Sequence, residues 1–577
     1  MTTFRVWAPQ PARVELDLSG EQHAMSRGED DWWSVDVASA GPGDDYAFVL
    51  DGGPPRPDPR SAWQPHGVNG PSRLVEHDAF AWTDRRWHGL PLAGALLYEL
   101  HVGTFTVEGT FDAAAERLAH LVDLGVSTVE LLPVNAFAGR HGWGYDGVGW
   151  YAVHDPYGGP DGLKRFVDAC HARGLGVVMD VVYNHLGPAG NYLPEFGPYL
   201  TEAHSTPWGP AVNLDRLGSD EVRRHILDNA LMWLRDYHLD GLRLDAVHAL
   251  VDERATPLLE ELAVEVEALG ARLRRQLFLV AESDLNDARL VTSREAGGCG
   301  LDGQWADDVH HALHALLTGE RAGYYGDFGS LPVLAKALTG MFVHDGSWSS
   351  FRGRQHGRRV PAAVPGHRFV TYLQDHDQVG NRAAGDRLSA SLSDGLLKVG
   401  AALLLTSAYT PMLFMGEEWG ARTPWQFFSD HEGELGEAVR AGRRAEFAAH
   451  GWNTEQVPDP QDPATFAAST LDWDELAAER SQELVAWTRD LVALRRSRPE
   501  LSDGRRDRVQ VGYDEDDQWV VVRRGAVAVA CNLAAHRQPV PLPGMPTSVL
   551  LASTGGFVFG AGQVGLDGES VALLELL

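Results

Sequence analysis

The chain contains two short apolar runs that each carry an acidic residue, Gly176-Val177-Val178-Met179-Asp180-Val181-Val182 and Gly241-Leu242-Arg243-Leu244-Asp245-Ala246-Val247. Each run follows a segment with helical periodicity, near residues 162–172 and 219–237. Apolar strands that alternate with amphipathic helices are typical of a parallel sheet covered by helices. The two runs therefore predict a parallel α/β architecture.

The same alternation continues on both sides of these runs. Six further strand candidates lie at residues 96–102, 128–134, 277–282, 303–305, 368–373 and 412–415. Further helices are predicted from Phe111 to Gly125, with Leu118, Leu121 and Val122 on one face, and over about 253–275 and 484–496. Eight strand–helix steps fit a (β/α)8 TIM barrel with long loops.

Short strands are predicted at both ends of the chain, outside the barrel segment. In the first part they lie at residues 4–7, 14–18, 32–37 and 46–50, and in the last part at 519–522 and 526–530. A chain of 577 residues holds several domains at roughly 150 residues each. We expect an N-terminal β-sandwich (1–92), a (β/α)8 barrel (93–500) and a C-terminal β-domain (501–577).

The charge balance excludes some partners. The chain has 49 Lys and Arg against 80 Asp and Glu, a formal charge of −31, which repels phosphate backbones and anionic lipids. The sequence therefore predicts no nucleic-acid partner and no membrane partner, and no apolar run approaches the length of a transmembrane helix. Three widely spaced cysteines and the lack of a signal-peptide pattern predict a cytoplasmic protein.

Acidic residues fall at the C-terminal ends of four predicted strands: Asp180, Asp245, Glu282 and Asp377. Active sites of (β/α)8 barrels lie at this rim, and a carboxylate in an apolar setting is costly unless it is paired or functional. One such residue is equally well explained as a helix cap or an ion-pair partner, whereas four favour an active site. Three converging carboxylates suit glycosidic bond cleavage, as nucleophile, proton donor and stabiliser of an oxocarbenium-like state.

Neighbouring residues suggest how these roles are divided. Arg243 lies two residues before Asp245, so both side chains point to one face, and a cation there favours the ionised form that a nucleophile needs. Glu282 follows an apolar strand, which favours a raised pKa and a proton-donor role. His185 and His376 are placed to donate to sugar hydroxyls, with metal ligation as the rival interpretation. No ligand cluster of standard spacing is present, so neither a metal nor another cofactor is predicted.

Four ordered segments resemble the signature segments of the α-amylase superfamily. They are Asp180–His185, Gly241–His248, Val280–Glu282 and Asp375–Asp377. The resemblance implies that Asp245 is the nucleophile, Glu282 the acid/base and Asp377 the transition-state stabiliser. It also implies sugar-binding roles for Asp180, His185, Arg243 and His376, and for Tyr145 as a stacking tyrosine. Asp375 departs from the asparagine that is frequent at its position, which leaves the local hydrogen bonding open.

Other stretches resemble one family within this superfamily, the malto-oligosyltrehalose trehalohydrolases. These stretches are Gln374–Arg382, Phe427–His431 and the Pro-Asp-Pro-Gln-Asp-Pro run at 458–463. The resemblance implies retaining hydrolysis of the α-1,4 bond beside a terminal trehalose, which releases trehalose and a malto-oligosaccharide. The pathway partner is then the synthase that forms malto-oligosyltrehalose.

Specificity for trehalose requires polar groups on the leaving-group side of the barrel. We hypothesise that Gln378, Asn381 and Arg382 donate hydrogen bonds to trehalose, since a site built on such contacts rejects ligands that leave them unpaired. The alternative is that these residues only shape their loop. Aromatic platforms for sugar rings are predicted in the rim loops at Trp143, Tyr145, Trp305, Phe427 and Phe428.

Two rival functions remain at this stage. A glycogen-branching or other α-glucan-active enzyme on the same scaffold differs only in which acceptor takes the sugar. An inactive glucan-binding protein is the rival from another class, and the complete set Asp245, Glu282 and Asp377 argues against it. Because one fold hosts many functions, the site rather than the barrel must separate these alternatives.

Overall fold

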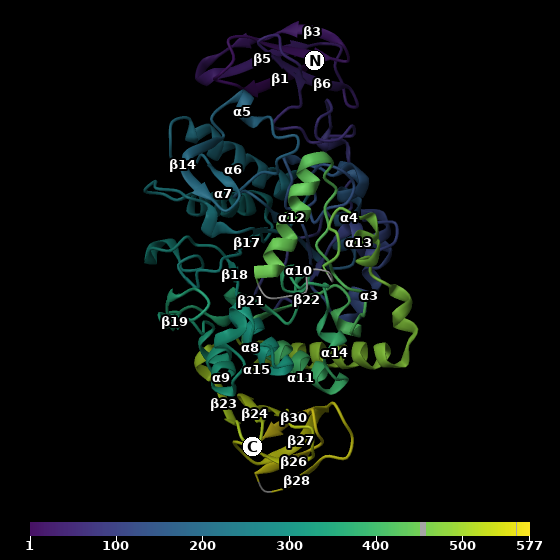
Figure 1. Cartoon of the computed structure of the whole chain (residues 1–577), viewed down its shortest axis with the longest axis vertical. Helices are drawn as coiled ribbons and strands as arrows, with labels where there is room; N and C mark the ends of the chain where they lie inside the picture. The colour runs from purple at the N-terminus through teal and green to yellow at the C-terminus, as the bar shows by residue number, and fades with distance from the viewer. Residues whose placement is uncertain (450–456, 561) are drawn as a thin grey trace.

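The computed structural model describes residues 1–449, 457–560 and 562–577, with the side chains of 446–449 left out. Figure 1 shows three units along the long axis, with the N-terminal strands at one end, the barrel in the middle and the C-terminal strands at the other end. Within the described ranges, no helix has the length and apolar character needed to cross a membrane.

The middle unit is a closed barrel of eight parallel strands that pair in chain order, and β22 returns to pair with β9. The strands are β9 (Leu97–Leu100), β10 (Thr128–Leu131), β13 (Gly176–Val181), β16 (Gly241–Leu244), β17 (Phe278–Ala281), β18 (Gly303–Trp305), β21 (Phe369–Tyr372) and β22 (Thr410–Phe414). The predicted (β/α)8 barrel is confirmed, with every strand candidate in place.

Helices cover the outside of the barrel. The main ones are α2 (Phe111–Glu116), α3 (Leu118–Leu124), α4 (Gly159–Ala172), α6 (Ser219–Asp236), α7 (Leu258–Leu273), α8 (Asp307–Thr318), α9 (Leu331–Gly340), α11 (Asp394–Leu405) and α14 (Glu479–Ser497). The predicted helix from residue 253 begins only at Leu258, because Pro257 disfavours helical geometry in the residue before it. Val122 was expected on the buried face of α3 but is 40% exposed, and Leu124 is buried in its place.

The barrel interior is filled by the inward side chains of alternate strand positions. Val178, Val280, Val370 and Met412 belong to one buried cluster there. Trp305 is also part of this cluster and is only 3% exposed, so its predicted place in a rim loop is wrong. As the last residue of β18, it points inward and lies under the Arg243 guanidinium, 4.4 Å from it.

The N-terminal unit has two antiparallel sheets, as a β-sandwich requires. One contains β1 (Thr2–Trp7), β4 (Ser26–Arg27) and β5 (Trp32–Val37); the other contains β2 (Val14–Leu18), β3 (Glu21–Ala24), β6 (Asp45–Leu50), β7 (Pro55–Arg56) and β8 (Ser72–Arg73). The rings of Phe4 and Tyr46 meet between the sheets at 5.1 Å. The Arg56–Glu195 and Arg60–Asp228 ion pairs tie this unit to the barrel segment.

The C-terminal unit is also built from two antiparallel sheets. Five strands form one sheet, β23 (Val509–Asp514), β24 (Trp519–Arg524), β25 (Val527–Asn532), β30 (Ser570–Leu576) and β27 (Pro546–Ala552); the other has β26 (Gln538–Pro541), β29 (Gln563–Leu566) and β28 (Val558–Gly560). Helix α14 runs between this unit and the barrel (Figure 1). The boundaries at residues 92 and 500 stay predictions.

A buried arginine joins the C-terminal unit to the barrel. Arg524 at the end of β24 donates to the carbonyl oxygens of Thr406 (2.7 Å) and Asp503 (2.5 Å). Its burial lowers the pKa of Arg524 to about 10. A buried guanidinium that donates to carbonyl oxygens on both sides of the junction favours one orientation of the two units, because another orientation would leave these buried donors without those partners.

We expect Arg524→Met to lower the free energy of unfolding by about 2 kcal/mol, since two buried carbonyl groups lose their donor. Urea unfolding followed by tryptophan fluorescence measures this change. Arg523→Met is the matched control, because the neighbouring side chain is partly exposed and donates to Gly525 and Pro543 within the C-terminal unit rather than to the barrel. Equal midpoints for the two variants would contradict the role of Arg524.

Candidate active site

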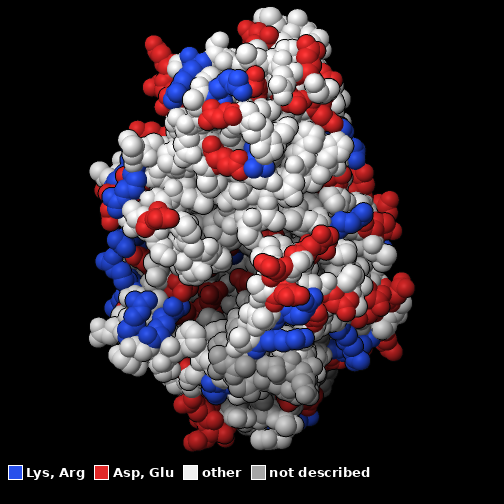
Figure 2. Space-filling view, turned by 45° about the horizontal axis from the view of Figure 1, so that its top comes forward, with Lys and Arg blue, Asp and Glu red and all other residues white. Residues whose placement is uncertain are grey.

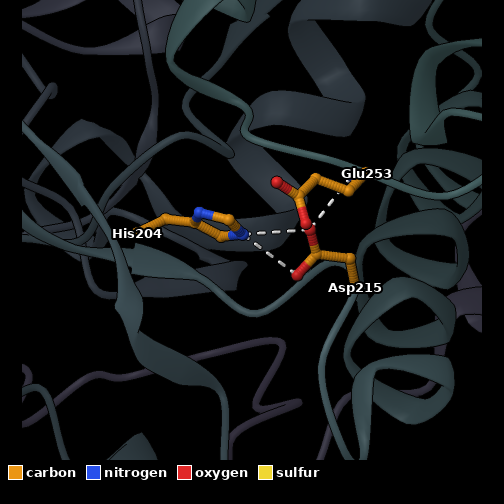
Figure 3. A group of neighbouring side chains, drawn as sticks. All are labelled: His204, Asp215 and Glu253. Carbon is orange, nitrogen blue, oxygen red and sulfur yellow. Dashed lines mark hydrogen bonds and ion pairs between the residues drawn. The ribbon is translucent and has the colours of Figure 1, made fainter.

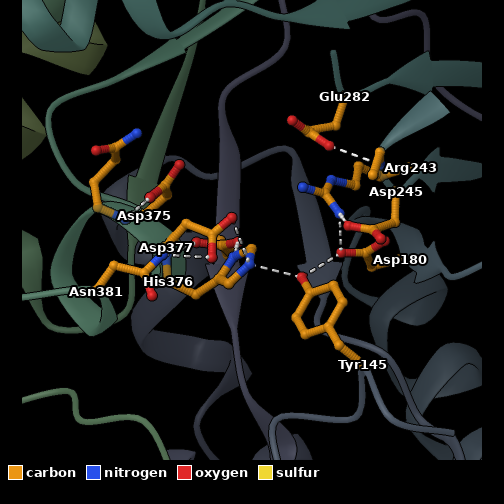
Figure 4. A network of polar contacts seen from close by, with 12 residues as sticks. Tyr145, Asp180, Arg243, Asp245, Glu282, Asp375, His376, Asp377 and Asn381 are labelled. Carbon is orange, nitrogen blue, oxygen red and sulfur yellow. Dashed lines mark hydrogen bonds and ion pairs between the residues drawn. The ribbon is translucent and has the colours of Figure 1, made fainter. Parts of the chain in front are cut away.

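The four acidic residues singled out from the sequence lie at the C-terminal rim of the barrel (Figure 4). Asp180 is on β13, Asp245 directly follows β16 and Glu282 directly follows β17. Asp377 lies in α10 (His376–Gly380), the short helix after β21. Parallel strands end at the same edge, so residues far apart in the sequence converge here.

Arg243 joins two of these carboxylates. Its Nη1 donates to Asp180 Oδ2 at 2.6 Å and to Asp245 Oδ1 at 2.8 Å, and the arginine side chain is fully buried. The expected pairing of Arg243 with Asp245 is therefore confirmed. Burial raises the pKa of Asp180 to about 6 even though Arg243 acts against this rise.

Asp245 receives a second donor from the segment after β13. Asn184 Nδ2 donates to Asp245 Oδ2 at 2.7 Å and to the Asp245 carbonyl at 2.8 Å. The two carboxylate oxygens are thus held by two different side chains. This arrangement fixes the direction of the carboxylate, which is what a nucleophile aimed at one carbon requires.

Glu282 has a different environment. Its Oε2 accepts a hydrogen bond from the Ala246 backbone N–H at 2.7 Å, and Ala246 has φ of +38°. A positive φ is strained for alanine. The strain has a structural reason here, because this turn directs the Ala246 N–H at the Glu282 carboxyl group. Burial raises the pKa of Glu282 to about 8 and outweighs Arg243, which acts in the opposite direction. The predicted upward shift is confirmed.

A chain of hydrogen bonds runs from Asp180 across the barrel rim. Tyr145 Oη donates to Asp180 Oδ2 at 2.6 Å and lies 2.7 Å from His376 Nε2. His376 Nδ1 lies 2.5 Å from Glu99 Oε1, and the His376 backbone N–H donates to Glu99 Oε2 at 3.0 Å. Although burial disfavours the charged ring, the Glu99 carboxylate raises the pKa of His376 to about 10.

The segment around Asp377 carries the remaining predicted residues. The Asp377 side chain is 48% exposed. Its Oδ1 accepts a hydrogen bond from Asn381 Nδ2 at 3.3 Å, and its Oδ2 lies 3.6 Å from His376 Nε2. Asp375 caps α10 by accepting from the Gln378 N–H at 2.6 Å, which explains how an aspartate serves at this position. Arg382 donates to Glu320 and Asp386.

His185 lies on the other side of Tyr145. Its Nε2 is 2.8 Å from the Tyr145 carbonyl oxygen, its Nδ1 contacts the Asn184 side chain, and burial lowers the pKa of the ring. The exposed Trp208 ring stacks on the imidazole at 4.6 Å. Trp208 comes from the hairpin of β14 (Leu200–Thr206) and β15 (Gly209–Val212).

A cavity of about 490 Å³ opens beside these residues. Its aromatic walls include Trp143, Tyr145, Trp208 and Phe427, together with His185. Phe428 also borders the cavity but is 1% exposed and packs on Trp425, so the expected platform role of Phe428 is wrong. In the space-filling view, acidic side chains are recessed in a hollow across the middle of the molecule (Figure 2).

Another group of possible metal ligands lies away from this centre. His204, Asp215 and Glu253 place their ligand atoms within 4.8 Å of one another (Figure 3). The Arg216 guanidinium reaches all three, at 3.0 Å from His204 Nε2, 2.9 Å from Glu253 and 3.3 Å from Asp215. The arginine therefore places a positive charge beside both carboxylates, and we assign no metal to this group.

Three residues of the site were not identified from the sequence: Glu99, Asn184 and Trp208. Asn184 stands within the segment that ends at His185, but its contact with Asp245 depends on the loop geometry. Glu99 had a signal, since it is an acidic residue inside an apolar strand run, as Asp180 is. Trp208 carried no signal beyond its residue type.

A closed parallel barrel whose rim holds a buried arginine, a paired aspartate and a glutamate with a raised pKa defines a class of protein, the glycoside hydrolases of the α-amylase type. The family model described as "Alpha amylase, catalytic domain" matches residues 75–199, and a domain of unknown function, DUF3459, matches residues 504–573.

Similar proteins of known name give a narrower assignment. A malto-oligosyltrehalose trehalohydrolase of Arthrobacter ramosus is 55% identical over 99% of each chain, and one of Mycobacterium tuberculosis is 55% identical over 94% of each chain. A crystal structure from Salmonella typhimurium has a TM-score of 0.91 at 40% identity and covers 99% of this chain and 97% of that one. The chain belongs to the malto-oligosyltrehalose trehalohydrolase family.

We expect the Glu282 carboxyl group to lose its proton near pH 8, because burial opposes the charged form. Infrared difference spectra between the wild type and Glu282→Gln, recorded from pH 4 to 10, isolate the carboxylic acid band of this residue. The band should persist through pH 7 and vanish above pH 9. A band lost below pH 6 would contradict the raised pKa.

Proposed function

We propose that this protein hydrolyses the α-1,4-glucosidic bond next to the terminal trehalose of malto-oligosyltrehalose, with Asp245 as nucleophile, Glu282 as acid/base and Asp377 as transition-state stabiliser. The products are trehalose and a malto-oligosaccharide. The observation that carries the proposal is the contrast between Asp245, held by two donors, and Glu282, whose pKa lies near 8. Two carboxyl groups whose environments differ in this way suit nucleophile and acid in one site.

In the first step, Asp245 attacks the anomeric carbon of the glucose unit next to trehalose. The carboxylate forms a bond to this carbon as the bond to the glycosidic oxygen breaks. Glu282 gives its proton to that oxygen, so that trehalose leaves as a neutral alcohol. Asp377 faces the ring with a half-exposed carboxylate, where it stabilises the positive charge that develops.

In the second step, Glu282 is ionised and removes a proton from a water molecule. The water oxygen attacks the same anomeric carbon and displaces the Asp245 carboxylate, and Glu282 regains its proton. Two displacements at one carbon leave the α configuration unchanged. Arg243 and Asn184 keep the Asp245 carboxylate oriented through both steps.

The malto-oligosaccharide arm fits the aromatic cavity. This cavity lies on the Tyr145 and His185 side, whereas Glu282 must face the departing oxygen from the other side. Trp208, Phe427 and Tyr145 offer ring faces on which glucose units pack through their apolar C–H surfaces. Tyr145, Asp180, His185, Arg243 and His376 are the residues we assign to the sugar ring at the reaction centre.

The trehalose unit is assigned to the wall that contains Gln378, Asn381 and Arg382. Tyr324 Oη donates to Gln378 Oε1 at 3.2 Å, and Tyr324 contacts the exposed ring of Phe351. Arg352, which follows Phe351 in the chain, forms an ion pair at 2.9 Å with Asp284. Asp284 lies two residues after Glu282. These contacts connect Gln378 to the leaving-group side. Within the trio, Arg382 is already paired with two carboxylates, which makes Gln378 the better candidate for a direct contact.

We also propose that the protein works in the cytoplasm, on the product of the synthase that forms malto-oligosyltrehalose. Three cysteines without disulfide partners, Cys170, Cys299 and Cys531, support a reducing compartment. A glycogen-branching activity is the second candidate, since the same barrel chemistry transfers sugar to a glucan when a glucan replaces water. High identity to the named trehalohydrolases over nearly the whole chain favours hydrolysis.

Incubation with maltotriosyl-trehalose and, separately, with maltopentaose tests this function by chromatography of the products. We expect free trehalose from the first substrate and at most slow breakdown of the second. Asp245→Asn should lower kcat by at least about 10⁴-fold, because it removes the nucleophile. Branched products, or equal cleavage of both substrates, would overturn the assignment while leaving the barrel chemistry intact.

Gln378→Ala should reduce the preference for maltotriosyl-trehalose over maltopentaose by roughly 10-fold, the loss expected for one hydrogen bond to a neutral sugar hydroxyl. The measured quantity is the ratio of kcat/KM values for the two substrates. Leu388→Ala, a buried apolar change beyond the same loop, controls for general loosening. If the ratio is unchanged in Gln378→Ala, this side chain only shapes its loop.

A further inference from the structure

We propose that Glu99 is a positioning residue of the reaction, which holds His376 as a cation with its Nε2–H directed at Tyr145 and the sugar site. The inference rests on the proposed function and extends it by a residue outside the superfamily segments recognised in the sequence. Glu99 lies on β9, the first barrel strand, and acts on a histidine that follows the seventh strand.

Glu99 binds His376 at two points. Its Oε1 lies 2.5 Å from the ring Nδ1 and its Oε2 accepts the backbone N–H at 3.0 Å, so the carboxylate fixes both the ring and the start of α10. Both side chains are buried. With Nδ1 as donor to Glu99, the opposite nitrogen is left to face Tyr145 Oη, 2.7 Å away.

The direction of the hydrogen bonds beyond His376 supports a proton on Nε2. Tyr145 has one hydroxyl proton, and it is donated to Asp180 Oδ2, so the tyrosine oxygen accepts from His376. His376 is then a donor at both nitrogens, which is the imidazolium form. The neutral ring has one donor only and cannot satisfy Glu99 and Tyr145 together.

The other groups that face the ring agree with a cation. Asp375 and Asp377 flank it on its own segment, and the Asp377 carboxylate lies 3.6 Å from Nε2. Asp180 acts through Tyr145, and the rings of Trp143 and Trp305 pack against the imidazole. His101 is the basic neighbour that opposes the charge, and burial keeps it neutral by lowering its pKa to about 3.

Glu130 provides a matched comparison within the barrel. It pairs with Glu99 in the β9–β10 register and is equally buried. Neither of its carboxyl oxygens has a hydrogen-bond partner among the described residues, and burial raises the pKa of Glu130 well above its ordinary value. A change from carboxyl to amide at Glu130 therefore alters the same layer of the barrel but does not remove a contact with His376.

Glu99→Gln and Glu130→Gln are compared with wild type on α-maltosyl fluoride between pH 5 and 10. In the glycosylation step, Asp245 forms a bond to the anomeric carbon as the C–F bond breaks, and fluoride leaves as an anion without a proton from Glu282. Loss of activity toward high pH then reports the histidine rather than Glu282. Fluoride release in the pre-steady state measures this step.

Glu99→Gln should return the ring toward its ordinary pKa of about 6.5, so the active imidazolium is lost as the pH rises above 7. We expect kcat/KM to fall about tenfold or more at pH 8.5, with a much smaller loss at pH 5.5, while Glu130→Gln follows the wild-type profile. A loss by the same factor at every pH, or no loss at all, would overturn the proposal.

A second measurement is made on the wild-type protein and does not require Glu99→Gln to fold. The His376 ring of the wild type, identified by loss of its resonance in His376→Gln spectra, should stay protonated through pH 8 in NMR titration. Titration near pH 6.5 would overturn the inference. Wild-type release of trehalose from maltotriosyl-trehalose is scored separately, so a failure of the proposed function is distinguished from a failure at Glu99.

Discussion

The site depends on one buried cation. Arg243 lies inside the barrel with its guanidinium shared between Asp180 and Asp245 and its plane over Trp305. A guanidinium removed from water is costly unless charged partners with good geometry surround it. The two aspartates supply part of that compensation through Nη1, and in return the arginine allows two carboxyl groups to lie close together at the ends of adjacent strands. Removing the arginine would leave two carboxylates at this point of the barrel without the cation that lies between them.

The same charge separates the behaviour of two carboxyl groups that are close in space. Asp245 accepts hydrogen bonds from Arg243 and Asn184, whereas in the part of the chain that the structure describes Glu282 accepts only the Ala246 backbone N–H. Burial then dominates at Glu282 and raises its pKa, although the same arginine acts against the rise. In the proposed mechanism, which of the two carboxyl groups is the nucleophile and which is the acid follows from the contact with the arginine, rather than from residue type.

The sequence predicted the parts of this arrangement that depend on local pattern. Apolar runs predicted the positions of all eight barrel strands, and the two-residue spacing of Arg243 and Asp245 predicted that these two side chains pair. The sequence did not predict contacts that depend on how the barrel closes. Glu99 and His376 are 277 residues apart, and nothing in either segment identifies the other as its partner. Residue type also misled at Trp305 and Phe428, because a large aromatic ring near a strand end serves the core as readily as a sugar platform.

Barrel closure itself explains why the long-range part of the site is rigid. Strand β9 is the first barrel strand and pairs with both β10 and β22, so a residue on it is fixed relative to the second and last strands together. Glu99 therefore holds His376 in a position set by the closed barrel. The contacts of Tyr145 with His376 and Asp180 then extend this fixed arrangement toward Arg243. A carboxylate on a flexible loop at the same distance would hold the ring less tightly, since its own position would fluctuate. The hydrogen-bond chain thus starts from a strand that is paired on both sides, which helps to fix the orientation of the groups that we propose to react.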